Sequence, residues 1–381
     1  MLVKRIAITI LVFLLVPAVL LSGCAQSTVV KDGKISVICT IFPLYDWTRQ
    51  IIGDQTESID LTLLLANKID LHNFQPSVDD IVKISDCDLF IYIGGESDKW
   101  VDDALKQATN TNMIVINLLE RLGDAAVVEE IVEGMEADDH DHDDDHDDDH
   151  DDDHDDDHDD DHNDDHDDDH NDDHDDNDDE HDDADEHDEH DDADEHDGHE
   201  AGFDEHIWLS LRNAQVISSI IAEALISLDA DNADTYRSNL AAYNEKLSDL
   251  DSAYKAAISA APVRTLLFGD RFPFRYLVDD YGLNYYAAFA GCSAETEASF
   301  DTVIFLSEKL DELGLNTVMV TESSDKKIAE TIIRESQGDN YQILVLDAMQ
   351  SVGSNDLATG ITYLSIMESN LDVLIKALGG Q

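Results

Sequence analysis

Histidine is concentrated in one part of this chain and is rare elsewhere. Of the 17 histidines in 381 residues, 15 lie between residues 138 and 200, here called the His/Asp tract. They are His140, His142, His146, His150, His154, His158, His162, His166, His170, His174, His181, His187, His190, His196 and His199. Neutral imidazole beside carboxylates suits borderline divalent metals, so the tract predicts gathering of zinc, nickel, cobalt or copper rather than an inert acidic spacer. Calcium is less favoured, because oxygen ligands alone would bind it.

The His/Asp tract also dominates the charge of the chain. It holds 42 Asp or Glu residues and no Lys or Arg. The whole chain has a net charge of −67, and the chain without the tract has a net charge of −25. A segment with almost no apolar residue cannot bury enough surface to offset its chain entropy, so it is predicted to be disordered. An acidic protein repels phosphate backbones, which argues against binding to nucleic acid.

Only His72 and His206 lie outside the tract. His72 stands in Asp70-Leu71-His72-Asn73-Phe74-Gln75-Pro76-Ser77, and His206 in Phe203-Asp204-Glu205-His206-Ile207-Trp208-Leu209-Ser210. Taken singly, each is more often an ordinary loop histidine than a metal ligand. Their distinctive settings make them candidates for a pair of ligands.

The first residues predict export and lipidation. Lys4 and Arg5 precede an apolar run from Ile6 to Leu21, which is typical of a secretory signal in residues 1–23. The run ends in Leu21-Ser22-Gly23-Cys24, which resembles the bacterial lipobox, so Cys24 is the expected lipidation site. Lipid on Cys24 would anchor the chain to the extracytoplasmic face of the cell membrane. The run is shorter than the roughly 20 apolar residues that a membrane-spanning helix needs.

The other three cysteines form no metal-type spacing and imply no disulfide framework. Cys39 and Cys87 lie in apolar surroundings that predict burial, whereas Cys292 has no assigned role.

Short apolar runs alternate with helical patterns on both sides of the tract. Predicted strands are Ile35 to Phe42, Ile59 to Leu65, Leu89 to Ile93, Met113 to Ile116, Thr265 to Phe268, Asn284 to Phe289, Thr317 to Thr321 and Gln342 to Leu346. Continuous apolar strands separated by helices indicate parallel sheets covered on both faces. The predicted fold is α/β, with two parallel-sheet lobes facing a cleft and joined by a long connecting helix.

This architecture predicts the following organisation. Its parts are a signal peptide (1–23), an N-terminal lobe (24–137), the disordered tract (138–200), the remainder of that lobe (201–230), the connecting helix (231–260) and a C-terminal lobe (261–381).

Both histidine settings resemble those of the zinc-type substrate-binding proteins of metal ABC importers, the ZnuA and AdcA-like group. In that family a His before Phe-x-Pro-Ser and a His in Asp-x-His-x-Trp-Leu ligate the metal, which implies His72 and His206 here. A His- and acid-rich insertion lies between them, as it does in this chain. The likeness extends from Lys34 to the C-terminus and includes Tyr276 to Leu283 and Leu346-Asp347.

The second lobe departs from the family pattern. The resemblance places a third ligand, His or Glu, five residues before Tyr276, where this chain has Arg271. Arginine stays protonated and has no free acceptor, so it cannot bind a cation. Asp270 is the alternative ligand if the loop shifts by one residue, or Arg271 pairs with a carboxylate. The family's further carboxylate falls on Asp347, which could equally serve as a turn or cap residue.

The resemblance implies capture of zinc without catalysis and delivery of the ion to an ABC permease with its ATPase, by a protein expected to be a monomer. Manganese remains an alternative cargo, and a surface metal-buffering or adhesion lipoprotein remains an alternative role. A metallohydrolase is disfavoured, because the sequence contains neither a His-Glu-x-x-His nor a Gly-x-Ser-x-Gly motif.

Overall fold

The structure, a computed structural model, describes residues 33–136 and 202–380, apart from residue 56, residues 67–68 and residues 294–296. The predicted signal segment, Cys24 and all 15 histidines of the His/Asp tract lie outside these residues. The described residues belong to one compact unit, which contains two parallel sheets.

The first sheet contains four parallel strands in the order β2-β1-β3-β4. Their bounds are β1 (Ile35–Cys39), β2 (Ile59–Leu63), β3 (Leu89–Tyr92) and β4 (Ile114–Asn117). Every residue of β3 is buried, as expected for a central strand covered by helices on both faces.

The second sheet repeats this arrangement with the order β6-β5-β7-β8. Its strands are β5 (Thr265–Phe272), β6 (Asn284–Ala290), β7 (Thr317–Val320) and β8 (Gln342–Val345), all paired in parallel. The two four-stranded parallel sheets confirm the α/β fold class predicted from the alternating apolar runs.

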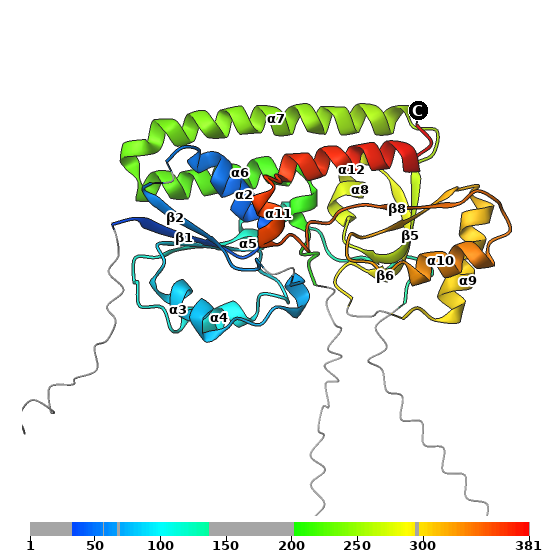
Figure 1. The fold of residues 1–381 in the computed structure, drawn as a ribbon, viewed down its shortest axis with the longest axis horizontal. Coiled ribbons are helices and arrows are strands. Elements are labelled where there is room, and N and C mark those ends of the chain that lie inside the picture. The colour runs from blue at the N-terminus through cyan, green and yellow to red at the C-terminus, as the bar shows by residue number, and fades with distance from the viewer. Residues whose placement is uncertain (1–32, 56, 67–68, 137–201, 294–296, 381) are drawn as a thin grey trace, which may run out of the picture. The chain divides into compact units, whose positions relative to one another are not determined.

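Helices surround both sheets, as Figure 1 shows. In the first part of the chain they are α2 (Phe42–Ile52), α3 (Val78–Asp86), α4 (Trp100–Leu105), α5 (Leu118–Leu122), α6 (Leu211–Leu228) and α7 (Ala233–Ala260). In the part of the chain that contains the second sheet they are α8 (Arg275–Tyr281), α9 (Phe300–Glu312), α10 (Lys327–Glu335), α11 (Ser354–Ala358) and α12 (Tyr363–Ala377).

The 28-residue helix α7 is the predicted connector. It lies along α2 and α6 in one half and along α8 and α12 in the other (Figure 1). Its buried Tyr254 donates to the carbonyl of Met367 in α12 at 2.6 Å. One apolar core runs through both lobes, and a second smaller core lies under α9 and α10. Because that shared core joins the lobes, their relative motion must be limited.

Helix α6 is long and apolar enough to cross a membrane by length and composition alone. Half of it is buried, and it packs along α7, so it is a core helix of this unit.

Two strand ends differ from the sequence-based expectation by more than two residues. Strand β5 was predicted to end at Phe268 but continues to Phe272, because Arg271 and Phe272 pair with β6 beyond a register shift. The following helix, α8, begins at Arg275. Near the start of the chain, β1 ends at Cys39 and α2 begins at Phe42, where Pro43 suits the first helical turn.

Candidate metal site

His72 is presented by a short turn after β2. The turn is a 3₁₀ segment, Leu71–Asn73, and the side chain of Asp70 caps it by accepting a hydrogen bond from the backbone N–H of His72 at 3.1 Å. Leu71 is buried and anchors the turn, while the side chain of His72 is about one-tenth exposed. The imidazole therefore lies at the carboxyl end of a parallel strand, a usual place for a ligand site.

His206 is fully buried and lies just before a second 3₁₀ turn, Ile207–Leu209. The backbone before it is fixed by an isolated bridge between Val128 and Phe203, and by the Tyr276 hydroxyl, which donates to the Asp204 carbonyl at 2.9 Å. The side chain of Asp204 accepts from the backbone N–H of His206 at 2.8 Å. The chain around His206 is thus held on several sides.

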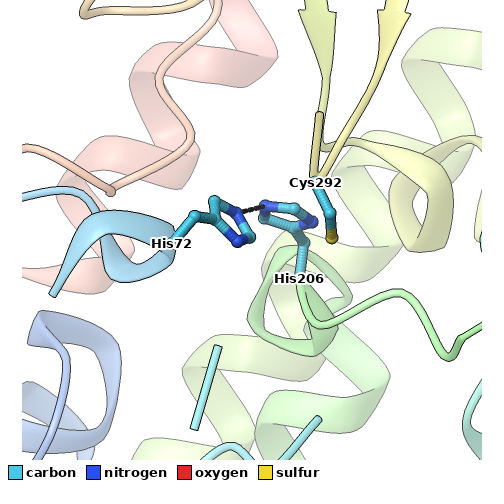
Figure 2. A group of neighbouring side chains, drawn as sticks. All are labelled: His72, His206 and Cys292. Atoms are coloured by element: carbon cyan, nitrogen blue, oxygen red, sulfur yellow. Dashed lines mark hydrogen bonds between the residues drawn. The ribbon is translucent and has the colours of Figure 1, made fainter. Parts of the chain in front are cut away.

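The structure brings the two predicted histidines together, although they are 134 positions apart. Their Nε2 atoms lie 3.3 Å from each other, and Figure 2 shows the two rings meeting end to end. Two nitrogens bound at 2.0–2.1 Å to one tetrahedral zinc ion would be separated by about 3.3 Å. The observed spacing is therefore that of two ligands to one ion.

The other nitrogen of each ring has a polar partner. His206 Nδ1 lies 2.9 Å from Asp204 Oδ1, and His72 Nδ1 lies 2.7 Å from Ser97 Oγ and 3.5 Å from Glu205 Oε2. A carboxylate only accepts hydrogen bonds, so it favours a proton on Nδ1 and leaves Nε2 with its lone pair. Such carboxylate–histidine pairs typically orient metal-binding imidazoles.

The two imidazoles differ in proton affinity. Burial, with the neighbouring His206, lowers the pKa of His72 to about 4. Burial also opposes charge on His206, but the carboxylates of Asp204 and Glu205 outweigh it and raise the pKa of His206. His72 is therefore ready to bind a cation at neutral pH, whereas a proton competes for His206.

Cys292 joins the two histidines. Its Sγ and one ring nitrogen of each histidine all lie within 4.8 Å of one another, and Figure 2 shows the thiol beside His206. Cys292 follows β6, and its backbone N–H donates to Glu129 at 2.9 Å. The preceding Gly291 comes so close to the His206 ring that an added Cβ would lie 3.2 Å from Cε1. Burial and nearby carboxylates raise the pKa of the Cys292 thiol.

The carboxylates predicted as second-lobe ligands have other partners. Asp270 Oδ2 accepts hydrogen bonds from the Thr321 backbone N–H and hydroxyl at 2.9 and 2.7 Å, which ties β5 to β7. Asp347 Oδ1 accepts from the Met349 backbone N–H at 2.8 Å, and burial beside Glu322 raises the pKa of Asp347 to about 7. Among the described residues, the group that could hold a metal contains neither Asp270 nor Asp347.

Arg271 pairs with a carboxylate, which is one of the two alternatives that the sequence allowed. Its guanidinium donates to Asp70 Oδ2 at 2.8 Å, across from the second lobe to the turn that carries His72. It pairs with Asp70 and not with the side chain of Asp270.

Two cavities reach this site. One of about 600 Å³ is lined in part by His72, Ser97, Arg271 and Cys292. The other, of about 910 Å³, is lined in part by Glu205 and Cys292 and also by Gly202, the first described residue after the tract. A hydrated ion therefore has room to approach the histidine pair.

Cys292 and Gln350 lie at the site, although neither was predicted from the sequence to belong to it. Gln350 follows β8, and its Nε2 lies 2.8 Å from His206 Nε2 and 3.5 Å from His72 Nε2. The sequence signal that could have found them is position, since both follow a predicted parallel strand at the edge where ligands gather.

The chain is similar to a known protein family and to several curated proteins. The model of the family ZnuA, described as zinc-uptake complex component A periplasmic, matches residues 37–377. The zinc-binding protein AdcA of Streptococcus pyogenes is 26% identical over 346 residues, covering 91% of this chain and 56% of AdcA. The chain thus spans about half the length of that relative. The high-affinity zinc uptake system protein ZnuA of Bacillus subtilis is 27% identical, covering 96% of this chain and 94% of ZnuA.

Solved structures show the same fold. The Zn(II)-bound ZnuA-like domain of Streptococcus pneumoniae AdcA has a TM-score of 0.60 at 24% identity, over 91% of this chain and 99% of that domain. The laminin-binding protein Lmb of Streptococcus agalactiae, described as bifunctional with adhesin and metal transporting activity, has a TM-score of 0.62 at 19% identity, with coverage of 91% and 99%.

Proposed function

The chain belongs to the ZnuA family of periplasmic zinc-uptake complex components, and on this premise we propose that it captures zinc for an ABC importer. Zinc is the cargo here and not a resident cofactor. The ion is held by the histidine pair and by groups of the second lobe, and is then presented to a membrane permease driven by its ATPase. The matched family consists of uptake components, which agrees with the expectation that the chain is not an enzyme.

The observation that carries this proposal is the 3.3 Å separation between the Nε2 atoms of His72 and His206. Two unprotonated imidazole nitrogens repel each other at this distance unless a cation or a donor lies against both of them. The side chains of Asp204 and Ser97 hold the two rings through their Nδ1 atoms. A preorganised pair of this kind loses little entropy when it binds an ion.

The donor set favours zinc over manganese as the cargo. Manganese prefers oxygen ligands, whereas imidazole and thiolate suit zinc. Cys292 supplies the only thiol in the described group that could hold a metal, and it lies beside two imidazoles. Zinc binding would displace the proton from this thiol, because the thiolate is the form that binds metals.

The His/Asp tract and the predicted lipid anchor complete the proposed function. The tract would raise the local concentration of zinc near the site in the manner of a tethered second binding module. Cys24, once lipidated, would hold the chain at the extracytoplasmic face of the cell membrane near its permease. The protein would act as a monomer and without nucleic acid.

A surface metal-buffering or adhesion role is the second candidate, since Lmb of Streptococcus agalactiae is described as both adhesin and metal transporter. The two roles differ in what loss of the gene would do. A transport subunit is required for growth when zinc is scarce, and added zinc restores that growth. A buffer or adhesin would leave such growth unchanged.

Zinc titration of the full chain tests the site itself. Competition against a chelator of known affinity reports the tightest ion separately from weaker ions on the tract. Replacing His72 or His206 with Ala should weaken this ion by at least tenfold, about 1.4 kcal/mol. Unchanged affinity in both variants would contradict the proposed function.

Cobalt(II) gives a separate test of Cys292. The tract contains no cysteine, so a thiolate-to-cobalt charge-transfer band can come only from a cysteine outside it. The band should disappear in Cys292→Ser and persist in the matched control Cys87→Ala, which alters a buried thiol next to Met113. A band that survives in Cys292→Ser would remove this thiol from the site.

A further inference from the structure

The side chain of Gln350 reaches both histidines from the second lobe. Its terminal amide nitrogen lies 2.8 Å from His206 Nε2 and 3.5 Å from His72 Nε2. Ligands of one tetrahedral ion that bind through nitrogen or oxygen are separated by about 3.3 Å. The end of the Gln350 side chain therefore occupies the position of a further ligand, on the side of the second lobe.

The amide of Gln350 can also hydrogen-bond to both rings. In the tautomers with both protons on Nδ1, both Nε2 atoms carry lone pairs and neither ring can donate to the other across the 3.3 Å contact. The NH₂ group of Gln350 has two hydrogens and can donate to both nitrogens.

The loop that carries Gln350 is built to hold this position. Glu322 accepts hydrogen bonds from the backbone N–H groups of Ala348 and Gln350, both at 2.8 Å. Met349, between them, has a left-handed φ of +62°, a conformation that is strained for a residue with a side chain. Strain of this kind persists where the surroundings enforce it, commonly at functional sites.

A direct link joins this loop to the segment of His206. The indole of Trp208, two residues after His206, donates to the carbonyl of Ala348 at 2.8 Å. Trp208 and Ala348 are both buried. The loop and the histidine therefore keep a fixed spacing across the two lobes.

We propose that Gln350 is a metal ligand that binds the ion through its Oε1 atom, and that the same carboxamide can instead turn its NH₂ group toward the histidine pair. A rotation of the carboxamide by half a turn exchanges nitrogen for oxygen without moving the loop. No bond forms or breaks apart from coordination. The inference rests on the proposed zinc function and supplies the second-lobe oxygen that the family pattern would take from a carboxylate.

Two substitutions of similar size separate a ligand from other roles. Gln350→Met removes both the donor and the oxygen, and should weaken the tightest zinc ion by about tenfold in chelator competition on the full chain. Gln350→Glu cannot donate but offers an anionic oxygen, so it should bind zinc at least as tightly as the natural chain. Gln342→Met, an exposed position in β8 of the same lobe, is the control and should have no effect.

Each other outcome has a distinct meaning. Tighter zinc binding in Gln350→Met would show that the amide only competes with the ion, and equal losses in Met and Glu variants would show that it only positions His206; either result overturns the inference. Unchanged affinity in both variants also overturns it. His206→Ala separates this failure from that of the proposed function, because it must still weaken zinc if the histidine pair is the site.

Discussion

Arg271 and Asp70 form an ion pair that crosses between the lobes beside the histidine pair. The guanidinium Nη2 and the Asp70 Oδ2 atom are 2.8 Å apart, and the two side chains are only 17% and 20% exposed. Asp70 uses its other oxygen to cap the turn of His72. Burial opposes the Asp70 charge, but Arg271 and His72 outweigh it and hold the pKa of Asp70 below its usual value. A residue at a family ligand position thus neutralises a carboxylate and ties the lobes together.

The Asp70–Arg271 pair predicts a rescue experiment. Asp70→Asn keeps an oxygen for the cap but leaves the Arg271 cation without its partner near the site, so zinc affinity should fall about fivefold, roughly 1 kcal/mol. Adding Arg271→Gln removes that cation and should recover most of the loss. Zinc competition on the single and double variants measures the coupling. A double variant no better than Asp70→Asn would contradict this explanation.

Asp270 is predicted to support the sheet more than the metal. Asp270→Ala removes both hydrogen bonds to Thr321 and should lower the free energy of unfolding by about 1–3 kcal/mol, because buried polar groups lose a partner. Zinc affinity of the folded protein should change less than threefold, well under 1 kcal/mol. Thermal unfolding of the metal-free protein gives the stability, and zinc competition on the same preparation gives the affinity. A large loss of zinc affinity would instead return Asp270 to the ligand set.

The pH dependence of zinc binding should depend on His206. Burial lowers the pKa of His206, but the negative charges of Asp204, Glu205 and Glu129 outweigh it and raise that pKa. Protons therefore compete with zinc for Nε2 as the pH falls through the pKa. Asp204→Asn removes the nearest negative charge and lowers the pKa, which should move the acid loss of affinity to lower pH. At high pH the variant should bind zinc about 10- to 100-fold more weakly, since it loses the carboxylate that orients the ring. An acid profile identical to that of the natural chain would exclude His206 as the titrating ligand.

Removing the His/Asp tract should lower the number of bound zinc ions and leave one tight ion. Both roots of the tract are fixed in the described structure, since the Glu136 backbone N–H donates to Ala288 and the Gly202 carbonyl accepts from Glu129, each at 2.9 Å. A flexible linker in place of residues 138–200 should therefore leave the histidine pair intact. Calorimetry on both forms counts the ions. Disappearance of the tight ion would place it in the tract.

Much of the fold could be predicted because it follows from local pattern. Strands such as β3 are continuous apolar runs buried on both faces, and the periodicity of α7 gives its length and its buried side. His72 and His206 were identified because each stands in a distinctive short motif, and their proximity agrees with that prediction. The composition of the tract predicts metal gathering from residue types alone.

The second lobe's share of the site was decided by tertiary structure. A register shift extends β5 through Arg271, and the left-handed backbone of Met349 changes the direction of the loop after β8. Neither feature follows from hydrophobic periodicity. Together they give Asp270 and Asp347 other hydrogen-bond partners, while Gln350 reaches the histidines. Periodicity determines which face of an element is buried, but the direction of a side chain in a loop depends on backbone dihedral angles that distant contacts select. Distant contacts of this kind also place Cys292 beside His72 and His206. Only the folded chain brings their ligand atoms within 4.8 Å of one another, close enough to bind one ion.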